Sequence, residues 1–142
     1  MNNIKILTNV QEILKKEFEE VTIKFLEDSL FDNAILNEIS IEPAGETYKS
    51  IALGGFAEKE TEDVAFTINL IRKQEFEGDT LSLENFIKEK DRIIELLYCE
   101  ELLGITGDFR SFEIQTEPLR FTDDEVVWDI WLYKINVLGK VR

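Results

Sequence analysis

The segment of residues 126–135 is apolar on both faces of the strand that it predicts. Successive side chains of a strand point to opposite faces of the sheet. One face carries Trp128, Ile130 and Leu132, and the other carries Val127, Trp131, Tyr133 and Ile135. Such a strand either lies centrally, with cover on both sides, or presents one face to a partner.

Three earlier segments are predicted to be strands, and residues 35–41 and 64–71 alternate apolar and polar side chains with the period of a strand. The clearest covers residues 64–71, in which every even-numbered residue is large and apolar. The others cover residues 35–41 and residues 48–56. We expect a turn at Pro43-Ala44-Gly45-Glu46 to separate these two strands, and a bulge or bend at Gly54-Gly55.

Two segments show the three- and four-residue apolar spacing of amphipathic helices. The first covers residues 8–21, and Thr8 with Gln11 has the spacing of a capping box at its start. The second covers residues 83–98 and follows Ser82, a favourable N-cap residue.

Two further segments complete the expected order of elements. Residues 21–31 fit either a continued helix or a strand. Phe112 and Ile114 indicate a strand that Pro118 must end or place at a sheet edge. The resulting order is α-β-β-β-α-β-β over residues 1–142, which predicts a single α+β domain. We expect a mainly antiparallel sheet with helices on one face.

The chain is strongly acidic and contains no histidine. It has 30 Asp and Glu residues against 16 Lys and Arg residues, a formal net charge of -14. Binding to a phosphate backbone depends largely on Lys and Arg, so we expect no sequence-specific nucleic-acid binding. We also expect no membrane association, because no apolar run is long enough to span a bilayer. We expect no signal peptide, because residues 1–8 lack its basic and apolar regions.

The residue types also restrict chemistry. Cys99 is the only cysteine, so an internal disulfide and a zinc site of Cys and His ligands are both excluded. Serine or cysteine catalysis with a histidine base is excluded within one chain. The acidic segments 58–63 and 123–125 lack the pattern of a calcium hand, and no glycine motif suits phosphate. We expect no enzyme activity and no catalytic, cofactor or metal site.

Aromatic residues near the end of the chain are the best candidates for a binding role. Trp and Tyr are common anchors of protein interfaces. We therefore expect a subunit interface that includes Trp128, Trp131, Tyr133 and Ile135, with the ordinary core as the alternative.

The order of these elements resembles that of the tail terminator and tail-completion proteins of long-tailed bacteriophages and related contractile tail particles. The resemblance is one of pattern and covers nearly the whole chain. It is carried by the predicted helices of residues 10–21 and 83–98 and the predicted strands of residues 35–41, 64–70 and 126–135.

The resemblance implies a structural protein that forms a hexameric ring at the end of a tail tube. Its partners would be copies of itself, tail tube proteins, and head or collar proteins. It would act in the host cytoplasm during assembly and then in the virion or tail-like particle. An acidic lumen would repel DNA phosphates, and its candidate residues are the loop carboxylates Glu58, Glu60, Glu62 and Asp63.

The acidity also fits a second class, an inhibitor that mimics DNA by presenting carboxylates to a nucleic-acid enzyme. Basic residues are interspersed with the acids, as in Lys15-Lys16 and Arg72-Lys73, which argues against an unbroken acidic face. A small enzyme that uses carboxylates alone is a third class, and no site in the sequence favours it.

Overall fold

The computed structural model describes residues 3–30, 35–53, 56–75, 80–98, 105, 107–122 and 128–141. For residues 50–53 and 56–60 it describes the backbone alone. Cys99, Gly54-Gly55, Val127 and the acidic segment 123–125 lie outside the described residues.

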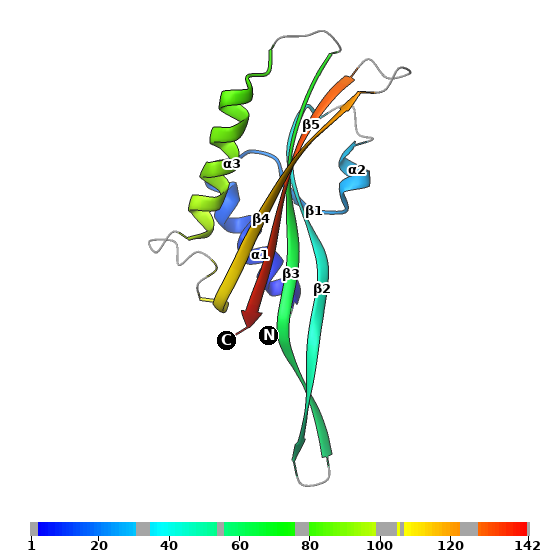
Figure 1. Ribbon diagram of the computed structural model, residues 1–142, viewed down its shortest axis with the longest axis vertical. Helices are drawn as coiled ribbons and strands as arrows, with labels where there is room; N and C mark the ends of the chain where they lie inside the picture. Colours follow the sequence, from blue (N-terminus) through cyan, green and yellow to red (C-terminus); the bar gives the residue numbers. More distant parts are fainter. Residues whose placement is uncertain are drawn as a thin grey trace.

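A five-stranded sheet forms the centre of the structure, in the order β1-β2-β3-β5-β4 (Figure 1). β1 pairs with β2 in parallel, and the other three pairings are antiparallel. The α+β class is confirmed, and the sheet is mixed. The strands are β1 (Val21–Ile23), β2 (Asn37–Leu53), β3 (Phe56–Glu75), β4 (Phe109–Thr122) and β5 (Trp128–Val141).

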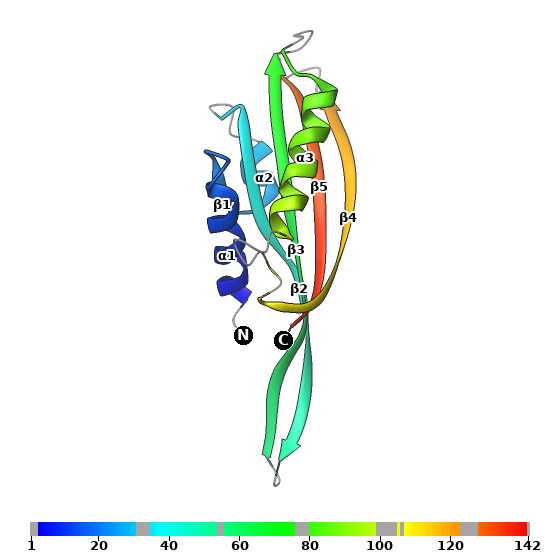
Figure 2. The same ribbon diagram turned by 90° about the vertical axis from the view of Figure 1, so that its left-hand side faces the viewer.

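Helices cover both faces of the sheet. α1 (Asn3–Lys15) and α3 (Leu83–Leu97) lie on one face, and the short α2 (Leu26–Leu30) lies on the other (Figures 1 and 2). The prediction that all helices share one face is therefore wrong. The two faces are called the core face and the α2 face below.

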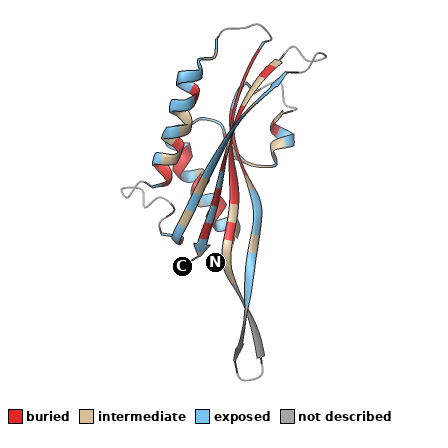
Figure 3. Cartoon of the chain, in the orientation of Figure 1, coloured by how far each residue is buried: buried red, intermediate tan, exposed pale blue. Residues whose placement is uncertain are grey.

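The core face is an apolar layer between the sheet and the two longer helices. The even-numbered residues from Val64 to Leu70 of β3 are fully buried, and α1 and α3 supply Val10 and Leu97 opposite them. Burying one such side chain stabilises the fold by about 1.5–3 kcal/mol. Figure 3 shows that both helices turn exposed residues outward, which confirms their amphipathic pattern.

The α2 face combines two buried apolar side chains with a polar layer. Ile71 and Leu132 are fully buried there, and Asn69 and Lys73 are also buried. The Lys73 ammonium group donates to the carbonyl oxygen of Ser29 in α2 at 2.7 Å. The sheet therefore needs cover on this face as well.

Of the two helix starts that the sequence predicts, one is confirmed and one is not. α1 begins at Asn3, and the Thr8 hydroxyl lies within it, donating to the Ile4 carbonyl oxygen at 2.7 Å. The predicted capping box is therefore wrong. The Ser82 cap is confirmed, because its hydroxyl oxygen accepts from the Asn85 amide at 3.3 Å. Residues 21–23 form β1, which was one of the two predicted alternatives. The other alternative, a continued first helix, is wrong, because α1 ends at Lys15 and α2 is a separate helix.

β2 and β3 form one long hairpin without the predicted turn at residues 43–46. β5 pairs with β3 only from Asp63 onward, so residues 48–53 and 56–61 pair with each other alone. These two segments are called the arm, and they project beyond the rest of the sheet (Figure 1). The expected acidic connection of residues 58–63 is part of strand β3.

Two β-bulges lie at the base of the arm. Pro43 pairs with Phe66 and Gly45 with Ala65, which leaves Ala44 as the extra residue on β2. Gly45 has a φ of 123°, a conformation that glycine adopts readily. Thr47 then pairs with Asp63 and Tyr48 with Thr61, so the second extra residue, Glu62, lies on β3.

The two prolines of the chain lie on strands with a free edge. Pro118 is in β4, the outermost strand, which confirms that it marks an edge. Pro43 is in β2 just beyond Ile41, where the pairing with β1 ends. Proline has no N–H to donate, and it hinders pairing of an edge with another chain.

Gly139 is expected to be intolerant of a side chain. A Cβ atom there would lie 2.4 Å from the ring of Phe109, which is buried. Gly139→Ala should lower the free energy of unfolding by about 1–3 kcal/mol, measured by urea denaturation. Gly107→Ala is the control, because no atom lies within 4 Å of its Cβ position. Equal stability of the two variants would contradict this close packing.

Candidate functional site

The proposed interface residues of β5 divide between the two faces of the sheet. Trp131, Tyr133 and Ile135 share the core face, as predicted, but Tyr133 and Ile135 are buried in the chain's own core. Tyr133 and Trp131 both contact Phe86 of α3, with ring centroids 5.2 Å and 5.6 Å apart. The alternative, an ordinary core, therefore describes Tyr133 and Ile135, whereas Trp131 is partly exposed.

Trp128 lies on the α2 face and is partly exposed. Further exposed apolar side chains of the sheet lie on the same face. Phe121 of β4 is 42% exposed and Leu138 of β5 is 50% exposed. The outward apolar surface of these strands is therefore on the α2 face, opposite to Tyr133 and Ile135.

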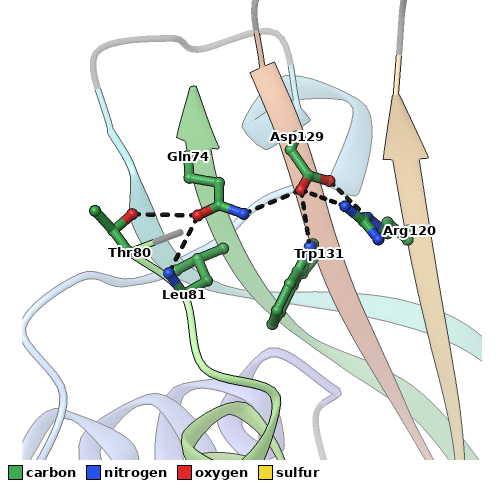
Figure 4. A network of polar contacts seen from close by, with 6 residues as sticks. All are labelled: Gln74, Thr80, Leu81, Arg120, Asp129 and Trp131. Atoms are coloured by element: carbon green, nitrogen blue, oxygen red, sulfur yellow. Dashed lines mark hydrogen bonds and ion pairs between the residues drawn. The ribbon is translucent and has the colours of Figure 1, made fainter. Parts of the chain in front are cut away.

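A polar cluster surrounds Asp129 at the end of the sheet near the start of α3 (Figure 4). The Asp129 carboxylate is almost completely buried and accepts two hydrogen bonds from Arg120, at 2.9 and 2.8 Å. Gln74 Nε2 and Trp131 Nε1 donate to it at 3.0 and 3.3 Å. The cluster therefore joins β3, β4 and β5.

The cluster also holds the segment that leads into α3. Gln74 Oε1 accepts from the Thr80 hydroxyl at 3.2 Å and from the Leu81 amide at 3.1 Å (Figure 4). Arg120 lies over the ring of Trp131, 5.8 Å from its centroid, a cation–π geometry. Sequence analysis missed this cluster because its members are far apart in the chain. The one local signal was a charged residue, Asp129, inside an apolar strand.

Hydrogen bonding holds the pKa of Asp129 below its usual value. The largest cause is the bonds from Arg120, with smaller contributions from Gln74 and Trp131, while burial acts in the opposite direction. The ionised form is therefore favoured in the folded protein. The cluster is a clamp between strands, since the almost completely buried carboxylate is held by donors from three strands.

A cleft of about 300 Å³ lies beside the cluster, between α3 and the sheet. Arg72 and Glu89 line it and form an ion pair, in which Arg72 Nε donates to Glu89 at 2.9 Å. The two charges neutralise each other. Across the described residues no group of three or more Cys, Asp or Glu side chains is arranged to hold a metal ion.

The predicted lumen residues lie along the β3 side of the hairpin. Glu58 and Glu60 belong to the arm, and their side chains are outside the described residues. Glu62 and Asp63 lie at its base, and Asp63 is 3.6 Å from the ammonium group of Lys140. The structure thus brings these four residues onto one strand, whereas the sequence analysis had placed them in a loop.

Basic side chains are distributed among the acidic ones over the described surface. Arg92 of α3 pairs with Glu17 and with Glu95. Further ion pairs join Lys24 to Glu38, Lys88 to Glu84, Lys90 to Asp91 and Lys140 to Asp63. The acidic excess is therefore interrupted by paired cations on several elements.

No protein-family model matches the chain, and no curated protein matches its sequence. Among the helices of the described residues, none has the length and apolar character needed to cross a membrane.

Replacing Asp129 should lower stability and change its pH dependence. The pKa of Asp129 is lowered on folding, so its stabilisation is present above its usual value of 3.8 and is lost as the pH falls through the folded value. Asp129→Asn should lower the free energy of unfolding by about 1–2 kcal/mol at neutral pH. The difference from the unchanged protein should shrink as the pH falls below 4, in urea titrations across pH.

Asp63→Asn is the matched control, because its longer ion pair with Lys140 is more exposed. Asp63→Asn should lower the free energy of unfolding by less than Asp129→Asn does at neutral pH. An equal loss in both variants would contradict the clamp.

Proposed function

We propose that this protein is a non-enzymatic structural subunit of a bacteriophage tail or tail-like particle. It forms a ring at the end of the tail tube, as a tail terminator or tail-completion protein does. Its partners are copies of itself, tail tube proteins and head or collar proteins. It acts in the host cytoplasm during assembly and then in the particle.

The arm is the observation that carries the proposal. A two-stranded ribbon is only marginally stable alone in water, and this one extends past the part of β3 that pairs with β5. From Ser50 to Ala57 the sequence contains no charged residue. An uncharged end on a projecting ribbon suits packing against a partner, because this part of β3 does not pair with β5.

The apolar residues on the α2 face support assembly through a different surface from the one first expected. Tyr133 and Ile135 are taken up by the core, whereas Phe121 and Leu138 are exposed. A ring requires two different contact surfaces on each subunit, because its neighbours bind head to tail. The arm and the α2 face are two such surfaces.

The net charge of -14 supports the role at a DNA channel. Glu58, Glu60, Glu62 and Asp63 follow one another along β3 from the arm to its base. Repeated around a ring, carboxylates on this strand would repel DNA phosphates and let the duplex pass. Six copies are expected from the resemblance to tail terminator proteins.

The proposal is tested by shortening the arm. Tyr48 pairs with Thr61, so residues 49–60 can be replaced by Asn-Gly, a dipeptide that closes a two-residue hairpin. The unchanged protein should form a closed oligomer as its concentration rises, and the shortened variant should remain monomeric at every concentration. The measurement is molecular mass by light scattering at low and high salt.

Lys88→Gln, on the exposed side of α3, is the control and should assemble normally. Circular dichroism should show that the shortened variant keeps its helices. A strictly monomeric unchanged protein would contradict the ring. If that monomer instead bound a basic nucleic-acid enzyme with an affinity that falls steeply with salt, the DNA-mimic inhibitor would replace the proposal.

A further inference from the structure

Three residues with complementary chemistry lie on neighbouring strands on the α2 face. Asn69 of β3 lies between its strand neighbours, with Ser40 of β2 as its Cα partner on one side and Lys134 of β5 on the other. Glu42 follows two residues after Ser40 on the same face of β2. An amide, an amine and a carboxylate are thus brought together from three adjacent strands.

Asn69 is held in one orientation by its amide nitrogen. Its side chain is fully buried, and Nδ2 donates to Glu42 Oε1 at 3.3 Å and to Ser40 Oγ at 3.2 Å. The carboxylate requires a donor, which fixes the nitrogen on that side. Within the described part of the chain, the oxygen Oδ1 has no hydrogen-bond partner. A buried amide with a free carbonyl oxygen calls for an explanation.

Lys134 has the position and length to reach that amide. Cross-strand partners have Cβ atoms about 5 Å apart, a gap that a lysine side chain spans easily. Lys134 and Glu42 line one cavity of about 470 Å³ beneath α2. Lys134 is in none of the ion pairs of the described residues, although the acidic residues Glu27 and Asp28 line the same cavity.

We propose that Lys134 and Asn69 form an isopeptide bond within the chain, with Glu42 as the proton carrier. The Glu42 carboxylate takes a proton from the Lys134 ammonium group, and the free amine attacks Cγ of Asn69. A bond forms between Lys134 Nζ and Asn69 Cγ. Glu42 returns that proton to Nδ2 as the bond from Cγ to Nδ2 breaks. The second proton of Nζ then passes through Glu42 to the departing ammonia, which leaves as one ammonium ion. No oxidant or other co-reactant is needed.

The placement of Glu42 suits this role. Its Oε1 accepts from the nitrogen that becomes the leaving group, so proton return needs no movement of the strand. Its Oε2 accepts from the Leu26 amide of α2 at 3.0 Å, which fixes the carboxylate beside Asn69. α2 covers the group, and the released ammonia has the cavity as its route out.

The first test is the intact mass of the purified full-length protein. The proposal expects a mass lower than that of the sequence by one molecule of ammonia. After tryptic digestion, the peptide of residues 60–72 should be joined to the peptide of residues 121–140, which is left uncut at Lys134. The full sequence mass would overturn the proposal. So would a mass loss without joined peptides, because cyclisation of Asn69 on its own backbone also releases ammonia.

Two variants separate the roles of the residues. Lys134→Arg keeps the positive charge but cannot attack, and Glu42→Gln keeps the shape but cannot carry the proton. Both should show the full sequence mass and no joined peptides. Lys140→Arg, on the same strand, is the control and should keep the mass loss. If Glu42→Gln gave as much of the joined peptides as the unchanged protein, the role of Glu42 would be overturned. Any joined peptides in Lys134→Arg would overturn the role of Lys134.

Discussion

Burial of β3 on both faces is the constraint on which the rest of the structure depends. Its even-numbered residues fill the apolar core face, and Thr67, Asn69, Ile71 and Lys73 are buried on the other. One helical layer would leave half of this strand in water. α2 is therefore required by the sheet, although it has only five residues. The same constraint explains why β5, the other strand with two apolar faces, lies directly beside β3.

The two faces achieve burial by different physical means. The core face uses apolar packing, which depends on area and tolerates small adjustments. The α2 face uses directed polar contacts, in which Glu42 accepts from the first amide of α2 and Lys73 donates to the carbonyl of Ser29 near its other end. These contacts fix the position of a helix that is too short to be held by apolar area alone.

Sequence analysis recovers the elements whose burial follows a regular period. Residues 64–71 and the α3 segment were predicted because one face of each is uniformly apolar. It failed where local and tertiary preferences conflict. The segment of residues 43–46 has the composition of a turn, yet Pro43 lies where the pairing with β1 has ended and Gly45 suits a bulge. The sequence did contain a signal for the hairpin. Gly54-Gly55 lies between two segments that suit strands, an arrangement typical of a hairpin turn.

The choice of inward face for β5 could not be made from its own sequence. Both faces are apolar, and the decision rests on the side that α3 occupies, which depends on contacts such as that between Phe86 and Tyr133. The Asp129 cluster is equally non-local, because Gln74 and Arg120 meet that carboxylate only after three strands have paired in register.

The two bulges at the base of the arm have a consequence for its construction. Ala44 is the extra residue on β2 and Glu62 the extra residue on β3, so the second offset cancels the first. Each bulge adds local right-handed twist, and the pairing beyond them returns to the alignment of the sheet. The two bulges thus twist the arm about its long axis, and the two strands have the same number of residues between the sheet and the end of the arm. Loss of either extra residue alone would leave the strands out of step by one position all the way to Leu53 and Phe56.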